Sequence, residues 1–405
     1  MNCKTQKPEF RMIECSISNL GKVVTGKTPS TKNSLFWEGD IPFITPKDIQ
    51  KTKHIFDTER NLTFEGMKSV KNCVLPENAI CVSCIGNIGY VAKTTSPAVT
   101  NQQINSIIVN DANNSDYVYY LMRSLWQRFK NYEGQSTTLS ILNKRQFSEI
   151  KILIHEDKAV QTKIANVLSS LDNKIELNEK INQNLEAQAQ AIFKSWFVDF
   201  EPFKNGKFVD SELGKIPEGW RVGRLSDICD IKMGQSPSGE SLHINSDGAI
   251  FFQGRADFGS RFPKNRLYTS EPRRMAKEGS ILLSVRAPVG DINIAMDSCC
   301  IGRGLASIHS RNQSFLYYLL QSLRRLFDMY NGEGTVFGAI NRDSLRNIKI
   351  LIPKSEIICE FERIANQIDN NIKNNELQSR RLSQLRDTLL PKLMSGEIDI
   401  SDVAV

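Results

Sequence analysis

The 405-residue chain repeats the order of its sequence features once, and no other property limits its possible folds so strongly. The strand-like segment EIKILIH at 149–155 returns as NIKILIP at 347–353, and the turn GKTPS at 26–30 returns as GQSPS at 234–238. The separation between equivalent residues falls from 208 to 198 along the chain, as loop insertions and deletions would cause. Solenoid repeats span only about 20–50 residues. The sequence therefore predicts two whole domains with one architecture.

Positive and negative charge alternate along the same repeat. Lys and Arg exceed Asp and Glu by six in residues 1–155 and by five in residues 211–353. Acidic residues exceed basic ones by two in each of the other segments, 156–210 and 354–405. Two separate basic segments suit a polyanion that touches both of them. The alternative is that a modest positive excess simply keeps each domain soluble.

The composition points to a protein without a membrane span or an export signal. Hydrophobic residues make up 40% of the chain, and no apolar run approaches the roughly 20 residues that a membrane span needs. The N-terminal sequence MNCKTQKPEF lacks the apolar stretch of a signal peptide. Nine cysteines without the spacing of a disulfide framework fit reduced thiols. We therefore expect a cytoplasmic protein that does not contact a membrane.

Two segments show the alternating four- and three-residue spacing of a coiled coil. The pattern runs from Ile164 to Trp196, and the same register runs from Phe361 to Leu389. A helix of 33 residues is roughly 50 Å long. An ordinary amphipathic surface helix is the alternative, but the shared register favours packing of the two helices on each other, with polar residues at equivalent core positions fixing the register. The predicted seam includes Ile164, Leu171, Asn178, Leu185, Ile368, Asn375 and Leu382.

Each basic segment shows the same mixed order of elements: a buried strand, a helix, and a final strand that leads into the long helix. Strands are expected at 79–84, 150–154, 280–285 and 348–352, and helices at 117–132 and 315–330. The predicted fold class is therefore α/β (α+β), duplicated, and alternating with two long helices. Glycine- and proline-rich turns connect the strands, and recognition side chains usually lie on such turns.

Residues 21–28, GKVVTGKT, match the phosphate-binding pattern GxxxxGK[ST]. That motif works only when a strand enters the loop and a helix leaves it, so that backbone N–H groups point at phosphate. Here Pro29 follows at once, and the second half has Gln235 in place of Lys27. The match is therefore expected to be accidental. An NTPase that uses residues 21–28 remains the alternative.

Metal-binding and catalytic patterns are weak throughout the chain. Cys81 and Cys84 form a single CxxC, but Leu282 and Val285 occupy the equivalent positions, so both cysteines are expected to replace buried aliphatic residues. The four histidines are scattered without the spacing of metal ligands. We therefore predict no metal site and no catalytic residues.

In their order, the motifs of the chain resemble the specificity (S) subunit of a type I restriction–modification enzyme. The resemblance covers essentially the whole chain. It depends on the paired TPS and SPS turns, ITPKDI at 44–49, TNQQIN at 100–105, AIFKSWFVDFEP at 191–202, GKIPEGW at 214–220 and LLPKLMSGEI at 389–398. The segment CIGRG at 300–304 departs from the pattern, because it is a poor counterpart of TNQQIN. The recognition domains of this family vary, so the departure bears on the contact residues.

The resemblance implies a DNA-reading protein that is not catalytic by itself and carries no cofactor. Target-recognition domains would occupy 1–155 and, after a linker, 201–353. Helical spacers at 156–200 and 354–405 would form an antiparallel coiled coil in a pseudo-two-fold arrangement. The implied partners are double-stranded DNA, two methyltransferase (M) subunits that use S-adenosylmethionine to modify adenine, and restriction (R) subunits that use ATP and Mg. A DNA-independent coiled-coil scaffold is a further alternative.

Candidate DNA contacts follow from side-chain chemistry. Arg and Lys read guanine, Asn and Gln read adenine, and Ser and Thr mostly position phosphate. Residues 1–155 hold 14 Lys and 5 Arg, whereas residues 211–353 hold 5 Lys and 14 Arg, so we expect more guanine contacts from the second domain. Simple turn chemistry is the alternative for the turn residues. The candidates are Lys27, Thr28, Ser30, Lys47, Asn87, Asn101 and Gln102 in the first domain, and Gln235, Ser236, Ser238, Gln253, Arg255, Arg286 and Arg303 in the second.

An aromatic cluster near the end of the first long helix is more apolar than a coiled-coil seam requires. Its members are Phe193, Trp196, Phe197 and Phe200. We predict that the cluster helps to dock the modification subunit. Burial of these side chains against their own domain is the alternative.

Overall fold

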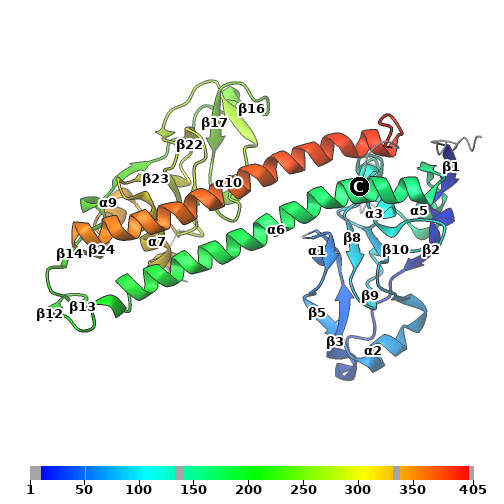
Figure 1. Cartoon of the computed structure of the whole chain (residues 1–405), viewed down its shortest axis with the longest axis horizontal. Helices are drawn as coiled ribbons and strands as arrows, with labels where there is room; N and C mark the ends of the chain where they lie inside the picture. Colours follow the sequence, from blue (N-terminus) through cyan, green and yellow to red (C-terminus); the bar gives the residue numbers. More distant parts are fainter. Residues whose placement is uncertain (1–10, 51, 133–140, 332–337, 401–405) are drawn as a thin grey trace, which may run out of the picture. The chain divides into compact units, whose positions relative to one another are not determined.

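The chain forms two compact units, each with parts of both long helices (Figure 1). Unit 1 comprises Met1–Asn178 and Leu377–Val405, and unit 2 comprises Glu179–Glu376. The long helices are α6 (Lys158–Phe197) and α10 (Ser355–Met394). The computed structural model describes residues 11–50, 52–132, 141–331 and 338–400.

The described part of unit 1 contains three sheets. The five-stranded sheet has the order β2 (Gly21–Thr25), β10 (Ile104–Val109), β7 (Ile80–Ser83), β8 (Val91–Thr94) and β4 (His54–Ile55). The four-stranded sheet has the order β5 (Arg60–Leu62), β3 (Trp37–Ile44), β9 (Ala98–Thr100) and β6 (Val74–Leu75). The strands β1 (Met12–Ser16) and β11 (Lys151–His155) form the third. The helices of its mixed domain are α1 (Pro46–Ile49), α2 (Phe64–Ser69), α3 (Ser115–Ser124), α4 (Trp126–Lys130) and α5 (Lys144–Glu149).

The central strands of the five-stranded sheet, β7 and β8, are buried along their whole length, and β7 is mostly apolar. Because side chains alternate along a strand, Ile80 and Val82 pack into one apolar cluster with α3, whereas Cys81 packs into a second cluster with Ile44 of the four-stranded sheet. The helix α3 begins at a side-chain cap, since Asn114 Oδ1 accepts a hydrogen bond from the Tyr117 backbone N–H at 3.0 Å. The core of unit 1 therefore has three layers.

The described part of unit 2 contains a similar, but not identical, order of elements. The strands β14 (Arg221–Arg224) and β24 (Lys349–Ile352) pair as β1 and β11 do. The four-stranded sheet has the order β15 (Asp230–Met233), β23 (Leu305–His309), β20 (Ile281–Ser284) and β21 (Ile292–Ile294). The five-stranded sheet has the order β16 (Leu242–His243), β18 (Leu267–Thr269), β17 (Ala249–Phe252), β22 (Cys299–Ile301) and β19 (Met275–Ala276). The helices are α7 (Gln313–Ser322), α8 (Arg324–Asp328) and α9 (Arg342–Arg346), and a hairpin joins β12 (Phe208–Ser211) to β13 (Gly214–Pro217).

Strands lie where the sequence predicted them, as β7, β11, β20 and β24. The two predicted short helices are each divided, because α3 ends before Leu125 and α7 ends before Leu323. These leucines take almost the same backbone conformation, with φ and ψ of −83° and 5° at Leu125 and −84° and 7° at Leu323. Neither break contains Gly or Pro, so apolar periodicity alone could not reveal it.

The two long helices pack on each other within each unit, and their directions are antiparallel. In unit 1, Asn178 Nδ2 donates to Gln378 Oε1 at 2.9 Å. Asp172, which precedes Asn178 in α6, accepts from Arg386, which follows Gln378 in α10. In unit 2, Asn375 Nδ2 donates to Asn182 Oδ1 at 2.9 Å. Of the predicted seam, Ile164 and Asn178 are fully buried, and the remaining members, Leu171, Leu185, Ile368, Asn375 and Leu382, are half-buried.

No helix in the described ranges has the length and hydropathy needed to cross a bilayer.

Candidate nucleic-acid interface

The segment that matches the phosphate-binding pattern does not form a phosphate-binding loop. Residues Gly21–Thr25 are the strand β2 itself, and the turn that follows leads to Pro29 without a helix. A Cβ atom on Gly21 would lie 2.1 Å from the Ile108 carbonyl oxygen, so this glycine is needed for the approach of β10. The glycines of residues 21–28 therefore serve strand and turn packing, which argues against the NTPase alternative.

In unit 1, two parallel strands bring separate candidate segments to one edge. The strands β3 and β9 pair in parallel, with Ile44 opposite Thr100, so their carboxyl ends meet. The Asn101 N–H donates to the Ile44 carbonyl at 3.0 Å across this junction. Lys47 lies in the short helix after β3, where it is exposed and forms an ion pair with Glu59 at 3.6 Å.

The turn at 26–30 packs directly on the segment after β9. Thr28 Oγ1 donates to Gln102 Oε1 at 2.7 Å. A Cβ atom on Gly26 would lie 2.2 Å from the Asn101 carbonyl oxygen, so only glycine fits there. The Ser30 carbonyl accepts from Trp37 Nε1 at 3.2 Å, which fixes the far end of the turn.

The loop after β7 completes this edge. The Cys84 N–H donates to the Gln103 carbonyl at 2.8 Å, and Ser83 Oγ donates a hydrogen bond to the Asn87 carbonyl at 2.7 Å. The Asn101 amide is engaged with Gln103 at 2.9 Å and is half-buried, so it is less available than the others. We call the loops at 26–30, 45–47, 84–89 and 101–103 the unit 1 edge. Its exposed candidates are Lys27, Ser30, Lys47, Asn87 and Gln102, while Thr28 and Asn101 are half-buried.

Unit 2 builds the equivalent edge from the same strand arrangement. The strands β17 and β22 pair in parallel, with Phe252 opposite Ile301. The Gln235 N–H donates to the Ile301 carbonyl at 2.9 Å. Ser236 Oγ then donates to Gln253 Oε1 at 3.0 Å and accepts from the Arg303 N–H at 3.3 Å. We call the loops at 234–238, 253–255, 285–286 and 302–304 the unit 2 edge.

The unusual sequence at 300–304 has a packing reason. A Cβ atom on Gly302 would lie 2.7 Å from Gln253 Oε1, and one on Gly304 would lie 2.8 Å from the Gln253 carbonyl oxygen. The backbone of this loop therefore rests directly on Gln253, which requires glycine on both sides of Arg303. The side chain of Arg303 is exposed. The loop thus keeps its place in the edge although its sequence departs from TNQQIN.

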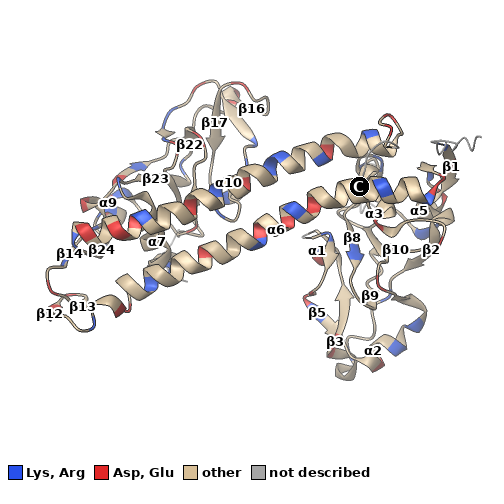
Figure 2. Cartoon of the chain, viewed as in Figure 1, with Lys and Arg blue, Asp and Glu red and all other residues tan. Residues whose placement is uncertain are grey.

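The remaining unit 2 candidates differ in availability. Arg255 forms an ion pair with Asp291, which also pairs with Arg324 at 2.5 Å. Ser238 Oγ donates to Glu271 at 3.3 Å. Arg286 is exposed and, like Arg303, makes no ion pair within the described ranges. These two arginines are therefore the most accessible candidates of this edge. Lys and Arg residues also occur on loops and short helices of both mixed domains (Figure 2).

In unit 1, a buried polar cluster joins the mixed domain to both long helices. Tyr120 OH donates to Asp172 Oδ2 at 2.5 Å, and Arg386 Nη1 of α10 donates to Asp172 Oδ1 at 2.6 Å. Lys53 reaches Ser169 of α6 at 3.1 Å, and it is 8% exposed. Burial lowers the pKa of Lys53, while the nearby Asp116 carboxylate opposes that shift. The sequence showed the repeated tyrosine pair and aspartate, but not their contact.

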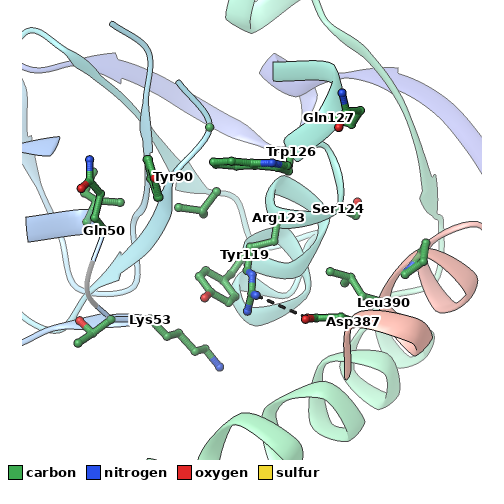
Figure 3. A pocket seen from close by; sticks show the side chains of 15 residues that line it. Gln50, Lys53, Tyr90, Tyr119, Arg123, Ser124, Trp126, Gln127, Asp387 and Leu390 are labelled. Atoms are coloured by element: carbon green, nitrogen blue, oxygen red, sulfur yellow. Dashed lines mark ion pairs between the residues drawn. The ribbon is translucent and has the colours of Figure 1, made fainter. Parts of the chain in front are cut away.

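A pocket of about 620 Å³ opens beside this cluster in unit 1 (Figure 3). Tyr90 and Trp126 form one side, with ring centroids 5.2 Å apart. Arg123 of α3 and Asp387 of α10 face each other at 4.0 Å. The pocket therefore combines an aromatic wall with an ion pair between the domain and the helix, and it holds no arrangement of a nucleophile and a base.

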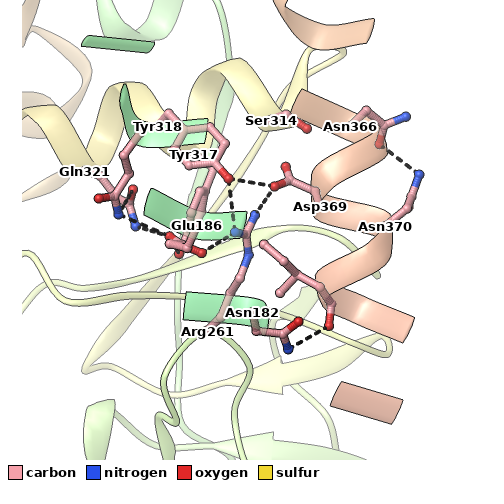
Figure 4. A network of polar contacts seen from close by, with 12 residues as sticks. Asn182, Glu186, Arg261, Ser314, Tyr317, Tyr318, Gln321, Asn366, Asp369 and Asn370 are labelled. Atoms are coloured by element: carbon pink, nitrogen blue, oxygen red, sulfur yellow. Dashed lines mark hydrogen bonds and ion pairs between the residues drawn. The ribbon is translucent and has the colours of Figure 1, made fainter. Parts of the chain in front are cut away.

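In unit 2, one arginine of the mixed domain takes the equivalent role (Figure 4). Arg261 is 3% exposed and forms ion pairs with Glu186 of α6 and with Asp369 of α10, the latter at 2.5 Å. Its guanidinium lies 4.2 Å from the ring centroid of Tyr317 and donates to Tyr318 OH at 3.2 Å. Tyr318 OH in turn donates to Asp369 at 2.8 Å. We call this set the Arg261 cluster.

The aromatic cluster of the first long helix divides into two pairs. Phe193 and Phe197 are buried in the core of unit 2, with the Phe193 ring 5.5 Å from the ring of Phe361. For these two residues the structure favours the alternative, burial against their own domain. Trp196 and Phe200 are half-buried, so part of each surface is available to a partner. Docking through Trp196 and Phe200 stays a prediction.

Cysteine chemistry and metal binding find no support within the described ranges. No group of three or more His, Cys, Asp or Glu side chains is placed to hold a metal ion there. Burial raises the pKa of the Cys81 thiol and of the Cys84 thiol to about 12. Both side chains lie in apolar clusters, as expected for cysteines that replace aliphatic residues.

Alkylation should therefore distinguish these thiols from an exposed one. In the folded protein we expect iodoacetamide to modify the exposed Cys359 first, and Cys81 and Cys84 far more slowly, because burial both shields these two thiols and raises their pKa. Peptide mass spectrometry over time would measure this order. Equal rates in urea are the control, and rapid modification of Cys81 in the folded chain would contradict the assignment.

Comparison with known proteins finds sequences similar to this chain along most of its length. The family model described as the type I restriction modification DNA specificity domain matches residues 12–187 and 217–387. The specificity subunit of the type I restriction enzyme MjaIX from Methanocaldococcus jannaschii is 33% identical, over 96% of this chain and 93% of the relative. The HindI specificity subunit from Haemophilus influenzae is also 33% identical, over 66% of this chain and 73% of the relative.

A solved structure shares the fold. The S subunit of a type I restriction–modification system from M. genitalium superposes with a TM-score of 0.61, covering 96% of this chain and 97% of the other at 17% sequence identity. Helices and mixed α/β domains thus combine in both chains in a similar way.

Proposed function

Since the chain belongs to the family of type I restriction–modification DNA specificity subunits, we propose that each of its two units reads one half of a bipartite DNA site. The chain is not an enzyme itself; it supplies the DNA sequence specificity of a type I complex. Its specificity directs adenine methylation or DNA restriction by the partner subunits.

One observation carries the proposal. In both units, candidate side chains from four separate loops gather where two parallel strands end, at the unit 1 edge and the unit 2 edge. Bidentate readers and phosphate-positioning hydroxyls lie together there, as recognition of a DNA groove requires. A DNA-independent scaffold would have no use for such edges, and that alternative is not favoured.

The two units are proposed to be products of a duplication, in a pseudo-two-fold arrangement. The matching strand orders support this, as do the equal conformations of Leu125 and Leu323. The recognition domains would then span 1–155 and 201–353, and the helical spacers 156–200 and 354–405. In unit 1, Asp172 connects the mixed domain to the helix pair, and in unit 2 the Arg261 cluster does so.

The partner assignments complete the proposal. Two methyltransferase subunits would dock on the helices, aided by Trp196 and Phe200, and restriction subunits would join them. S-adenosylmethionine, ATP and Mg would be used by those partners, and this chain would bind none of them. The assembly would act in the cytoplasm on double-stranded DNA. Arg286 and Arg303 support the expectation of more guanine contacts in the half-site read by unit 2.

Deletion of the gene tests the proposed function directly. Host DNA should contain N6-methyladenine in one split, asymmetric sequence motif, and that motif should lose methylation when the gene is deleted. Long-read mapping of modified bases in the two strains measures this. A chain carrying only unit 2 edge substitutions is the matched control, because it should change one half of the motif alone. An unchanged methylation pattern after deletion would reject the proposal.

A further inference from the structure

A second cationic site lies in unit 2, outside the residues nominated from the sequence. It is a pocket of about 420 Å³ between the strand β15, the helix α9 and the residue that precedes β19. Its cations come from three separate segments of the chain. The pocket is lined by Ser226, Cys229, Asp230, Ile231, Lys232, Met233, Arg274, Arg342 and Arg346.

The charges of this pocket are available to a ligand. Arg274, Arg342 and Arg346 are exposed, and none of them forms an ion pair with a residue that the structure describes. Lys232 Nζ donates to the Met275 carbonyl at 2.9 Å, which draws the ammonium across from β15 toward β19. Asp230 supplies the only carboxylate of the lining. Four cations against one anion leave a strongly positive hollow.

The pocket is joined to the unit 2 edge by shared backbone contacts. The Ile301 N–H donates to the Arg274 carbonyl at 2.9 Å, and the Ile301 carbonyl accepts from the Gln235 N–H at 2.9 Å. Arg274 and Gln235 are therefore held by the same residue. Lys232 precedes Gln235 by three residues, or roughly 10 Å of extended chain. That distance is close to the ~12 Å width of the DNA major groove, which the phosphate backbones border.

Unit 1 does not repeat this set of cations, which makes it an internal comparison. The positions equivalent to Lys232, Arg274, Arg342 and Arg346 are Val24, Cys73, Lys144 and Ser148, so one cation replaces four. Val24 is buried, and Cys73 packs against the same apolar cluster. The cations of unit 2 are thus an addition to a shared framework rather than a requirement of the fold.

We propose that this arginine pocket binds the phosphate backbone of DNA beside the groove that the unit 2 edge reads. The inference rests on the proposed function and adds to it a sequence-independent contact made by one unit only. Arginine suits this role because its planar guanidinium matches the geometry of phosphate oxygens. The pocket would hold unit 2 in register on the duplex while the edge reads bases.

The salt dependence of DNA binding tests this assignment. The full chain would be assembled with its methyltransferase subunits and titrated with two DNA duplexes. One contains the sequence motif that the complex methylates, without the methyl groups, and the other contains a scrambled sequence. In the triple variant R274Q/R342Q/R346Q, the slope of log K against log salt should become shallower by about 2–3, since each neutralised phosphate contributes about 0.9. The ratio of affinities for the two duplexes should stay within about threefold of the parent ratio.

Two further variants make the result specific. R274K/R342K/R346K retains the charges and should keep most of the slope. Arg311→Gln removes an exposed arginine that does not line the pocket and should change the slope by less than about 0.5. An unchanged slope in the glutamine triple variant, or a loss confined to the specific duplex, would overturn the arginine pocket while leaving the proposed function intact. If the parent complex did not prefer its own motif, the proposed function would fail, and the pocket assignment with it.

Discussion

Replacing Arg261 with methionine is expected to lower the free energy of unfolding of unit 2 by about 3–5 kcal/mol. The substitution leaves Glu186 and Asp369 in a largely buried site without their shared cation, and it removes the guanidinium from the face of Tyr317. Urea unfolding of the full chain, followed by the fluorescence of Trp196 and Trp220, would report the transition of unit 2.

The reason for this loss can be separated from simple loss of packing. If uncompensated carboxylates cause it, the triple variant R261M/E186Q/D369N should recover more than half of the lost stability, because amides cost less to bury than carboxylates. Arg221→Met is the matched control. Arg221 pairs with Asp227 at 3.4 Å on the surface, and breaking such an exposed pair should leave the urea midpoint almost unchanged. Equal destabilisation by Arg261→Met and the triple variant would show that the charges are unimportant.

Local patterns in the sequence were sufficient to predict the helices and strands, but not the side-chain contacts that connect them. Short continuous apolar runs predict β7 and β20, and heptad spacing predicts both long helices, because those signals depend on near neighbours in the chain. The contact between Arg261 and Asp369 joins residues more than 100 positions apart. No local pattern marks Arg261, since the tyrosine pair and the aspartate recur in both halves, whereas the cation that meets them comes from a different place in each.

The candidate interface was predicted unevenly for a related reason. Turn residues such as Thr28 and Ser236 were found because the turn itself recurs, and the structure places them in contact with Gln102 and Gln253. The pocket beside β15 was missed because its cations come from three separate segments, and only one of the equivalent positions in the first half holds a cation. The repeat identifies site residues that both halves share. Residues that only one half has, such as these cations, can be grouped only from the structure.

The largest expected effect on recognition is that of the double variant Q253A/R303A. Ser236 joins the two residues, since it donates to Gln253 Oε1 and accepts from the Arg303 N–H. A bidentate contact is worth about 1–3 kcal/mol of discrimination. Loss of two such contacts should therefore weaken binding to the specific duplex by roughly 30-fold to 10⁴-fold, while binding to a scrambled duplex changes less than about threefold. Titration of the assembled complex with both duplexes measures the difference.

This expectation differs from that for the arginine pocket, and the two can be compared in one experiment. Base readers govern the ratio between specific and scrambled DNA, whereas phosphate contacts govern the salt slope. In Q253A/R303A the ratio of affinities for specific and scrambled DNA should therefore fall toward one. The slope of log K against log salt should change by about one, because the variant loses one cation. The single variant Ser236→Ala should lie between the parent and the double variant, because the hydroxyl positions the readers without reading bases itself. Equal weakening on both duplexes would show that Gln253 and Arg303 serve affinity alone, and the unit 2 edge would then need other residues as its readers.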